Sequence, residues 1–184
     1  MSSVRKLEWI SIDDYLAGEE VAEVRHEYVA GGVYAMVGST ARHNRISGAL
    51  FARLRAHLAG SSCEAFVTDI KVRVDDAFYY PDVVVSCVPV DPTAVYLTEP
   101  TLIAEVLSDS TEGRDRMEKW IAYRSLASLQ EYLLIAQDEP RLEALRRRGD
   151  GWEQAVFGAD DVVELESVGL SFPLQDLHTV PATG

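Results

Sequence analysis

Two stretches of the chain decide the expected fold, YYPDVVVSC at residues 79–87 and TLIAEVLSDST at residues 101–111. The first begins a run of valines on Asp82, and the second carries Glu105 in the middle of an apolar run. Runs that are apolar on both sides are typical of central strands in a sheet whose faces are covered. A buried carboxylate without a partner costs several kcal/mol or shifts its pKa until it is neutral. Each stretch therefore predicts a central strand with an acid that a salt bridge, a hydrogen-bond network or a metal ion stabilises.

Helix and strand signals surround these two runs. Helices are predicted over residues 11–18 with Ser11 as N-cap, over 39–60 with Ser39 or Thr40 as N-cap, and over 110–127 with Ser110 or Thr111 as N-cap. Strands are predicted over residues 64–76 and 131–136, and hairpins are predicted to turn on Gly31-Gly32 and on Gly149-Asp150-Gly151. We expect an α/β (α+β) fold in which helices flank a mixed central β-sheet, with an N-terminal hairpin and a C-terminal β extension.

The periodicity within these elements predicts which side chains are buried. The first long helix carries a stripe at a spacing of four, Ile46, Leu50, Leu54 and Leu58. In the strand over 64–76, a buried face of Ile70, Val72 and Val74 alternates with a wetter face of Asp69, Lys71 and Arg73. The main apolar side of the second long helix is predicted to consist of Met117, Trp120 and Ile121.

Composition sets limits on the class of protein. The 184 residues favour a single domain, 1–184, with a polar, frayed C-terminus. The first residues lack the apolar core of a signal peptide and no stretch is long enough to cross a bilayer, so we expect a cytoplasmic protein without membrane contact. Cys63 and Cys87 lack the CxxC spacing, and we expect reduced thiols packed among apolar neighbours.

The net charge of −13 disfavours non-specific nucleic-acid binding, because an acidic protein repels phosphate backbones at long range. Two arginine clusters leave room for a local basic surface: Arg42, Arg45, Arg53 and Arg55, and Arg141, Arg146, Arg147 and Arg148. From charge alone, both clusters are expected to be solvated faces of a helix or a hairpin.

The two strand acids are candidate metal ligands. If their strands are neighbours, Asp82 and Glu105 converge near one end of the sheet. Two carboxylates together with waters and a substrate phosphate suit Mg²⁺ or Mn²⁺. The alternative is a structural role, in which backbone amides or an arginine hold each acid, and an aspartate before a strand is also a common turn residue. Because perturbed acids gather at functional sites, the pair favours a site.

Periodicity alone gives the other polar candidates structural roles. Asp115, Lys119 and Tyr123 form one row along the second long helix, away from its main apolar side, so Asp115 and Lys119 are expected to form an exposed pair. His43 lies on the buried stripe near the start of the first long helix, where the helix dipole disfavours an imidazolium, so a hydrogen-bonded core histidine is expected. Glu27 fits the polar face of the N-terminal hairpin.

Several segments, in this order and spacing, resemble a known family. YYPDVVVSC, LIAEVLSDSTEGRD running into KWIAY, and EYLLI are similar to the Uma family of "putative restriction endonucleases", within the PD-(D/E)XK nuclease superfamily. EYVAGGVYAM followed by ARHNRISGAL resembles the N-terminal half of the family. No single motif is specific, but their order and spacing together are. The resemblance implies a single nuclease-like domain with a restriction-endonuclease-like core over about 15–172, a C-terminal tail over 173–184, and a divalent metal at one edge of the sheet.

The resemblance also implies site residues. Asp82 matches the motif aspartate and Glu105 matches the second acid. The lysine of the superfamily should follow two residues after that acid, where this chain has Leu107. In this family the lysine has moved to the following helix, and Lys119 is the matching position. The family's other polar site residues fall at Glu27 and His43.

The expected function is that of a Mg²⁺-dependent endonuclease that hydrolyses phosphodiester bonds in DNA. Asp82 and Glu105 would bind Mg²⁺ or Mn²⁺, and Lys119 would position water or stabilise the transition state, with support from His43 and Glu27. On this expectation, Lys119→Met abolishes cleavage and leaves the fold intact. A homodimer would bring two sites to a duplex.

Two other classes of function remain open. A catalytically inactive binding module with a nuclease fold, acting through protein or nucleic-acid contacts, fits the acidic charge of the chain. Acid/base hydrolysis of glycosides by paired carboxylates would need a sugar-sized cleft between the acids. The match of Lys119 to the nuclease family argues against the glycosidase.

Overall fold

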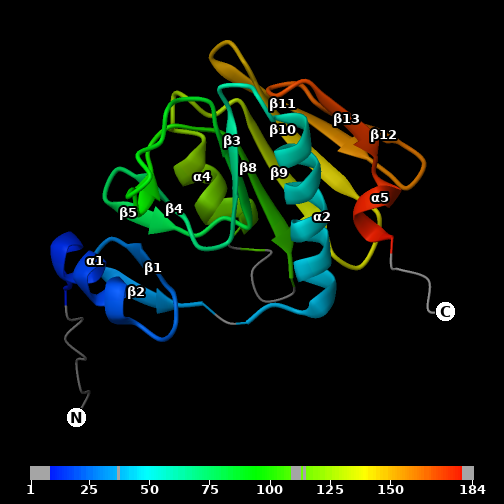
Figure 1. Ribbon diagram of the computed structural model, residues 1–184. Coiled ribbons are helices and arrows are strands. Elements are labelled where there is room, and N and C mark those ends of the chain that lie inside the picture. The colour runs from blue at the N-terminus through cyan, green and yellow to red at the C-terminus, as the bar shows by residue number, and fades with distance from the viewer. Residues whose placement is uncertain (1–8, 37, 109–112, 114, 180–184) are drawn as a thin grey trace.

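The two apolar runs form neighbouring strands, β6 (Val83–Ser86) and β8 (Pro100–Leu107), near the centre of the molecule (Figure 1). This computed structural model describes residues 9–36, 38–108, 113 and 115–179. Nearly every residue of the two strands is buried, which confirms that they are central strands. The helical elements are α1 (Ile12–Val21), α2 (Ala41–His57), the π-helical turn η1 (Asp115–Lys119), α4 (Trp120–Tyr123) and α5 (Gln175–His178). The other strands are β1 (His26–Val29), β2 (Gly32–Ala35), β3 (Glu64–Val67), β4 (Lys71–Val74), β5 (Ala77–Tyr79), β7 (Tyr96–Leu97), β9 (Glu131–Ala136), β10 (Leu142–Arg148), β11 (Gly151–Phe157), β12 (Val162–Leu165) and β13 (Leu170–Pro173).

Two mixed sheets and a hairpin account for the strands in the described part of the chain. The larger sheet has the order β11-β10-β9-β8-β6-β3, and only its β8–β9 pair is parallel. The smaller sheet has the order β2-β1-β5-β4-β7, and β12 pairs with β13. The predicted mixed α/β fold with flanking helices is thereby confirmed.

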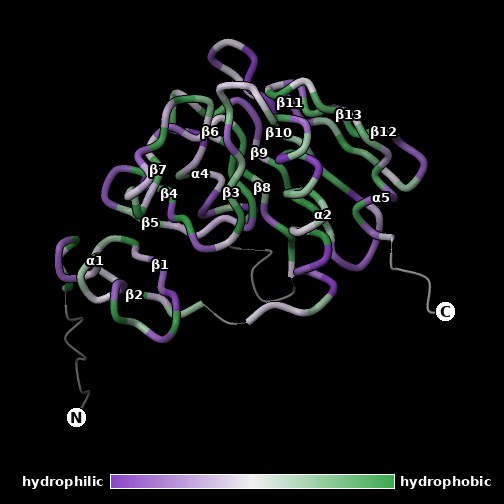
Figure 2. Tube along the Cα trace, in the orientation of Figure 1, coloured by the Kyte–Doolittle hydropathy of each residue, from purple (hydrophilic) through white to green (hydrophobic). Residues whose placement is uncertain are grey.

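The larger sheet is covered on both faces. The side chains of Val83 and Val85 pack in a cluster with α2, α5 and the β12–β13 hairpin, whereas Val84 packs in a second cluster with β4, β5 and α4. The alternation follows from the period of two along a strand. Figure 2 shows hydrophobic residues concentrated along the central strands and hydrophilic ones at many peripheral turns. β6 and β8 thus lie in the middle of a layered structure, and only their ends approach the surface.

Helix α2 forms where the sequence predicts it. The side chain of Thr40 accepts a hydrogen bond from the backbone N–H of His43 and caps the first turn. The predicted stripe is buried against the larger sheet, at Ile46, Leu50, Leu54 and Leu58. Helix α1 is likewise capped by Ser11, as predicted. The predicted caps of the second long helix, Ser110 and Thr111, lie outside the described residues.

Two local predictions were wrong. The segment 64–76 is not one strand: it breaks after β3 at Thr68, whose φ is +59°, and continues as β4 in the other sheet. Lys71 is therefore buried rather than on a wetter face. The N-terminal hairpin turns on Ala30-Gly31, because Gly32 already pairs with Val29. Both turn residues have positive φ, 48° and 82°, which matches the twist of a two-residue hairpin turn.

The C-terminal region is more structured than expected. The predicted hairpin forms between β10 and β11, with Arg148 paired to Gly151. The segment from residue 173 was expected to be a polar, frayed tail, but Leu174 and Leu177 are buried against α2 in the core. The tail prediction is wrong for residues 173–179. Of the two arginine clusters, the C-terminal one is only partly solvated, since Arg146 is buried against Glu131.

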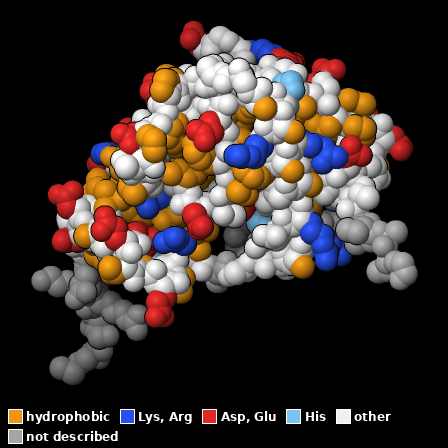
Figure 3. Space-filling view, viewed as in Figure 1, with side chains coloured by type: hydrophobic (Ala, Val, Ile, Leu, Met, Phe, Trp, Pro, Cys, Tyr) orange, Lys and Arg blue, Asp and Glu red, His pale blue; other side chains and the backbone are white. Residues whose placement is uncertain are grey.

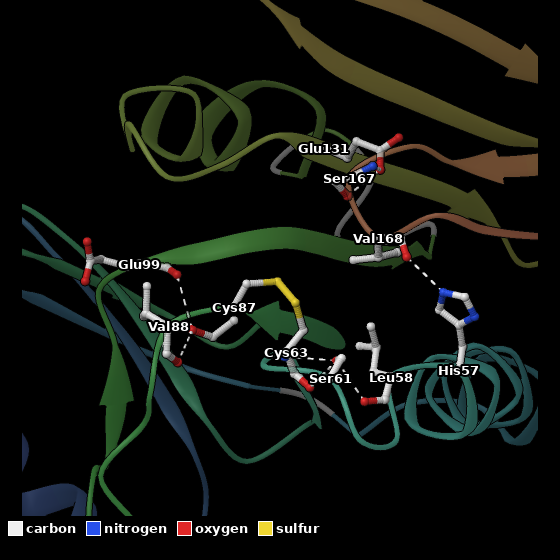
Figure 4. Close-up of a disulfide and its surroundings, with 11 residues drawn as sticks. His57, Leu58, Ser61, Cys63, Cys87, Val88, Glu99, Glu131, Ser167 and Val168 are labelled. Atoms are coloured by element: carbon white, nitrogen blue, oxygen red, sulfur yellow. Dashed lines mark hydrogen bonds between the residues drawn. A yellow bond between two sulfur atoms is a disulfide. The ribbon is translucent and has the colours of Figure 1, made fainter.

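Cys63 and Cys87 form a disulfide, so the prediction of reduced thiols is wrong (Figure 4). Cys63 precedes β3 and Cys87 follows β6, next to the cross-strand pair of Glu64 and Ser86. The bond therefore links the two strands at the end opposite to Asp82, which precedes β6. Within the described residues, no helix is long and apolar enough to cross a membrane.

Candidate active site

Asp82 and Glu105 lie opposite one another across two neighbouring strands. In the β6–β8 ladder, Val83 pairs with Ala104, so the next position pairs Asp82 with Glu105. Cross-strand partners share one face of a sheet and their side chains are neighbours. The two acids therefore converge at one end of the sheet, because β6 and β8 are adjacent strands.

Asp82 is held from two directions. Its Oδ2 accepts a hydrogen bond from the backbone N–H of Val106 at 2.7 Å, and His43 Nε2 lies 3.2 Å from the same oxygen. His43 belongs to the capped first turn of α2. The N-terminal end of this helix therefore lies next to Asp82, at the start of β6. The histidine is not a core residue: it lies at the edge of a pocket with the aspartate as its partner.

Lys119 lies between two buried carboxylates. Its Nζ is 2.9 Å from Glu105 Oε1 and 3.1 Å from Glu27 Oε1. Tyr123 Oη donates to the same oxygen of Glu105 at 3.3 Å, and the backbone N–H of Tyr80 donates to Glu27 Oε1 at 3.2 Å. All five sequence candidates thus come together in one cluster, at the meeting point of β1, α2, β6, β8 and η1.

Burial reverses two expectations that rested on periodicity. Lys119 is 6% exposed and Glu27 is 3% exposed, so neither belongs to a solvated surface. Met117 and Ile121 are instead 65% and 54% exposed, so the predicted apolar side is wrong for these two residues, whereas Trp120 packs against the core as predicted. The physical reason is charge: two buried carboxylates require a cation, which turns the Lys119 side inward. The side chain of Asp115 lies outside the described part.

The cluster forms one wall of an open pocket of about 240 Å³. His43, Asp82, Glu105 and Lys119 line it, whereas Glu27, which contacts Lys119, is not part of the lining. The other walls are formed by Arg25, Met36, Gly38, Ser39, Thr40, Thr68, Asp69, Tyr80, Pro81, Val106 and Ser108. Charges of both signs surround the acids, and Figure 3 shows acidic and basic side chains interspersed over the face it draws, without one continuous basic area.

The donor set of the pocket is compatible with a small divalent cation. Mg²⁺ is commonly held by one or two carboxylates and completes its shell with waters and phosphate oxygens. Asp82 and Glu105 supply two such carboxylates at adjacent positions. Within the described residues there is no group of three acids, histidines or cysteines arranged for a metal. The fit is therefore to a cation that needs two protein ligands, and not to a fully enclosed site.

Sequence reasoning missed three groups that hold the site residues. Tyr123 supports Glu105, and its signal was its position four residues after Lys119. Tyr80 supports Glu27 through its backbone, which no side-chain pattern could reveal. The backbone N–H of Val106 holds Asp82 because β8 runs antiparallel to β6, so only the register of the two strands identifies it.

Comparisons with known proteins bear on the family and the fold of this chain. A family model described as "Uma2: Putative restriction endonuclease" matches residues 12–175. An uncharacterized protein of Synechocystis sp., slr1290, is 36% identical over 173 residues, which cover 92% of this chain and 91% of the relative. A second uncharacterized Synechocystis protein, sll1609, is 36% identical over 142 residues, which cover 74% of this chain and 80% of the relative.

One solved structure extends the comparison to three dimensions. The crystal structure of a "putative nuclease belonging to DUF820" from Anabaena variabilis matches with a TM-score of 0.76 at 20% identity. The match covers 92% of this chain and 97% of that one. At this identity the likeness concerns the fold, and it confirms the fold class expected from the sequence.

Proposed function

This chain belongs to the Uma2 family, described as "putative restriction endonuclease", and from that membership we propose that it is a Mg²⁺-dependent endonuclease that hydrolyses phosphodiester bonds in DNA. The observation that carries the proposal is the buried Lys119 between Glu27 and Glu105, beside Asp82, at the wall of an open pocket. This arrangement puts a cation and two candidate metal ligands, Asp82 and Glu105, where a substrate in the pocket can reach them.

Asp82 and Glu105 are the residues that would hold Mg²⁺ or Mn²⁺. When bound, such an ion lowers the pKa of a coordinated water and offsets charge on the phosphoryl oxygens. His43 and the backbone N–H of Val106 both contact Oδ2 of Asp82 and so fix the orientation of that carboxylate. A fixed carboxylate loses less conformational entropy when it takes a ligand.

Lys119 is the residue that would act on the reacting groups. Its ammonium contacts Glu27 and Glu105 and lines the pocket. From the pocket wall it can act on an attacking water or on a phosphoryl oxygen, where a cation stabilises the developing negative charge. Glu27 then acts through Lys119: it keeps the ammonium in place and does not itself reach the pocket.

The test uses an isosteric pair of variants. Asp82→Asn should lower the rate of plasmid cleavage in Mg²⁺ by at least about 100-fold, the size of loss that follows removal of one charge-stabilising group. The asparagine oxygen still accepts from Val106, so the melting temperature should fall by no more than about 4 °C, or about 1 kcal/mol. Asp160→Asn makes the same chemical change at an exposed turn far along the chain and should cleave like the wild type.

A second candidate is a binding module that keeps the nuclease fold without activity. The net charge of −13 favours it, because an acidic protein repels phosphate backbones at long range. Calorimetric titration of Mn²⁺ into the same two variants and the wild type separates the candidates. Binding lost only in Asp82→Asn supports the nuclease. Wild-type protein that neither binds Mn²⁺, with or without an oligonucleotide, nor cleaves any DNA would favour the module.

A further inference from the structure

A second polar cavity adjoins the candidate active site. It measures about 340 Å³, and Arg25, Asp69 and Tyr80 line both it and the first pocket. Its remaining walls are formed by Leu16, Glu19, Glu20, Ile70, Lys71, Ala94 and Val95. This volume lies at the lower end of the range of small-ligand pockets, roughly 300–1,000 Å³. The cavity therefore admits one ring system of an extended substrate and excludes a duplex.

Lys71 is a buried cation with incomplete compensation. It is 6% exposed, and within the described residues its Nζ donates a hydrogen bond only to Tyr80 Oη, at 3.2 Å. The ammonium also lies 5.2 Å from the centroid of the Tyr80 ring. An ammonium has three donors, and removing it from water without acceptors is unfavourable. Burial accordingly lowers the pKa of Lys71. Two donors remain for a ligand in the cavity.

Glu19 does not neutralise Lys71 directly, because other groups bind it. Tyr80 Oη donates to Glu19 Oε2 at 2.9 Å, His26 Nδ1 lies 2.8 Å from Oε1, and the backbone N–H of His26 donates to Oε2 at 3.2 Å. Burial alone would raise the pKa of Glu19, but the hydrogen bonds from His26 and Tyr80 bring it below its usual value. The network fixes Tyr80, and through it Lys71, at the wall of the cavity.

The charges around the cavity select a neutral ligand. Glu20 and Asp69 are exposed carboxylates that line the cavity. Nε of Arg25 lies 3.5 Å from Oδ1 of Asp69. Together with Glu19, the two exposed acids give three carboxylates in the lining, against two basic side chains, Arg25 and Lys71. This excess of negative charge disfavours a phosphate. A ligand that presents an acceptor to Lys71 and donors to the carboxylates satisfies both. Among the bases, guanine combines an acceptor edge at O6 and N7 with donors at N1 and the 2-amino group, whereas adenine carries an amino group in place of O6.

We propose that this cavity binds a guanine base of the nucleic-acid substrate, next to the phosphodiester bond that enters the candidate active site. Lys71 donates to guanine O6, and Glu20 and Asp69 accept from N1–H and the 2-amino group. The inference rests on the proposed function for its substrate class. It goes further by making the enzyme selective for the nucleotide beside the cut.

The first test changes the base and leaves the protein intact. Wild-type protein in EDTA, which prevents metal-dependent cleavage, is titrated into labelled single-stranded oligonucleotides with one central guanine, hypoxanthine, 2,6-diaminopurine or adenine. We expect guanine to bind roughly tenfold or more tightly than adenine and diaminopurine, the size of one bidentate base contact. Hypoxanthine, which keeps O6 but lacks the 2-amino group, should be intermediate. Equal affinities, or no binding to any of the four, overturn the inference.

The second test removes the cation. Lys71→Met should erase the preference for guanine and leave the affinity for the adenine oligonucleotide unchanged. Arg73→Met, in the same strand, is the matched control and should keep the preference. An equal loss for all four bases would make Lys71 a structural residue and overturn the inference. If Lys71→Met does not fold, the base series on the wild type decides alone.

The outcomes for the two proposals are separable. A guanine preference in a protein that cleaves no DNA refutes the nuclease and leaves the base site. Active cleavage without any preference at the flanking base refutes the base site and leaves the nuclease.

Discussion

At the scale of single residues, the site is organised by charge balance around Lys119. One ammonium contacts two carboxylates that are almost fully buried, and Asp82 lies beside them with His43 as its partner. Removing one member of a buried ion pair leaves an uncompensated charge in a medium of low dielectric constant. The stability of the protein is therefore coupled to the same residues that would carry out the reaction.

Lys119→Met should abolish cleavage, but the burial of Lys119 changes the expectation that the fold is unaffected. The variant leaves Glu27 and Glu105 buried without a cation, which should lower the free energy of unfolding by roughly 3–5 kcal/mol. Urea denaturation measures this loss. The double variant Glu27→Gln/Lys119→Met removes one of the stranded charges and should recover a large part of the stability without any recovery of activity.

A double variant no more stable than Lys119→Met would mean that Glu27 is not the charge that Lys119 compensates. Recovery of cleavage in the double variant would remove Lys119 from the reaction. The role of this lysine could not be derived from helical periodicity, which gave it an exposed partner. Periodicity reports apolar contacts, whereas the orientation of this turn depends on carboxylates supplied by β1 and β8, which are distant in sequence.

At the scale of elements, Arg116 ties the turn η1 to the larger sheet. Its Nη1 and Nη2 donate to Glu143 Oε2 and Oε1 of β10, both at 3.0 Å. These hydrogen bonds hold the pKa of Glu143 below its usual value, although burial opposes them. Arg141 and Gln154 contact the same carboxylate. The segment that carries Lys119 is thereby fixed to a strand that is not part of the site.

This tie predicts a pH dependence of stability. A carboxyl whose pKa is lower in the folded state contributes stability above its unfolded pKa, about 4.3 for glutamate, and loses it as the pH falls through the folded pKa. Glu143→Gln should therefore be less stable than the wild type near pH 7, and the difference should shrink towards pH 3. Chemical denaturation across this range measures it. Glu139→Gln, which removes an exposed carboxylate, should show no comparable difference. A constant gap between wild type and Glu143→Gln would contradict the linkage.

Elements with strong local signals could be predicted from the sequence, and those set by distant contacts could not. Helix α2 carries its own cap and apolar stripe, and β6, β8 and β9 are continuous apolar runs. The break at Thr68 carries no such signal, because a threonine at positive φ is intrinsically unfavourable. Its backbone N–H donates to the carbonyl of Asp82, so a tertiary contact accompanies the break. The burial of Lys71 followed from the same break, and so did the cavity beside the site.

At the scale of the whole molecule, the disulfide closes a loop that contains β3–β6 and Asp82. Cys63 and Cys87 are 24 residues apart, and a crosslink over such a loop stabilises a protein by about 3 kcal/mol, chiefly by restricting the unfolded chain. Cys63→Ser/Cys87→Ser should therefore unfold at a lower denaturant concentration than the oxidised wild type. A reductant should lower the midpoint of the wild type and leave the variant unchanged. Equal midpoints with and without reductant would mean that the bond does not form in solution.

Of the three acids in the cluster, Glu27, Asp82 and Glu105, only Asp82 lies within that loop. The residues of the cluster are also synthesised in a fixed order, with Lys119 last. A polypeptide leaving the ribosome presents Glu27, Asp82 and Glu105 before residue 119 has been made, and domains begin to fold as they emerge. Until then the acids have no Lys119 ammonium between them, and water is their partner instead. Fragments that end before Lys119 are left in that state permanently. A nascent chain interrupted within the crossover from β8 to β9 can thus pair its central strands, but it cannot assemble the charged cluster at their end.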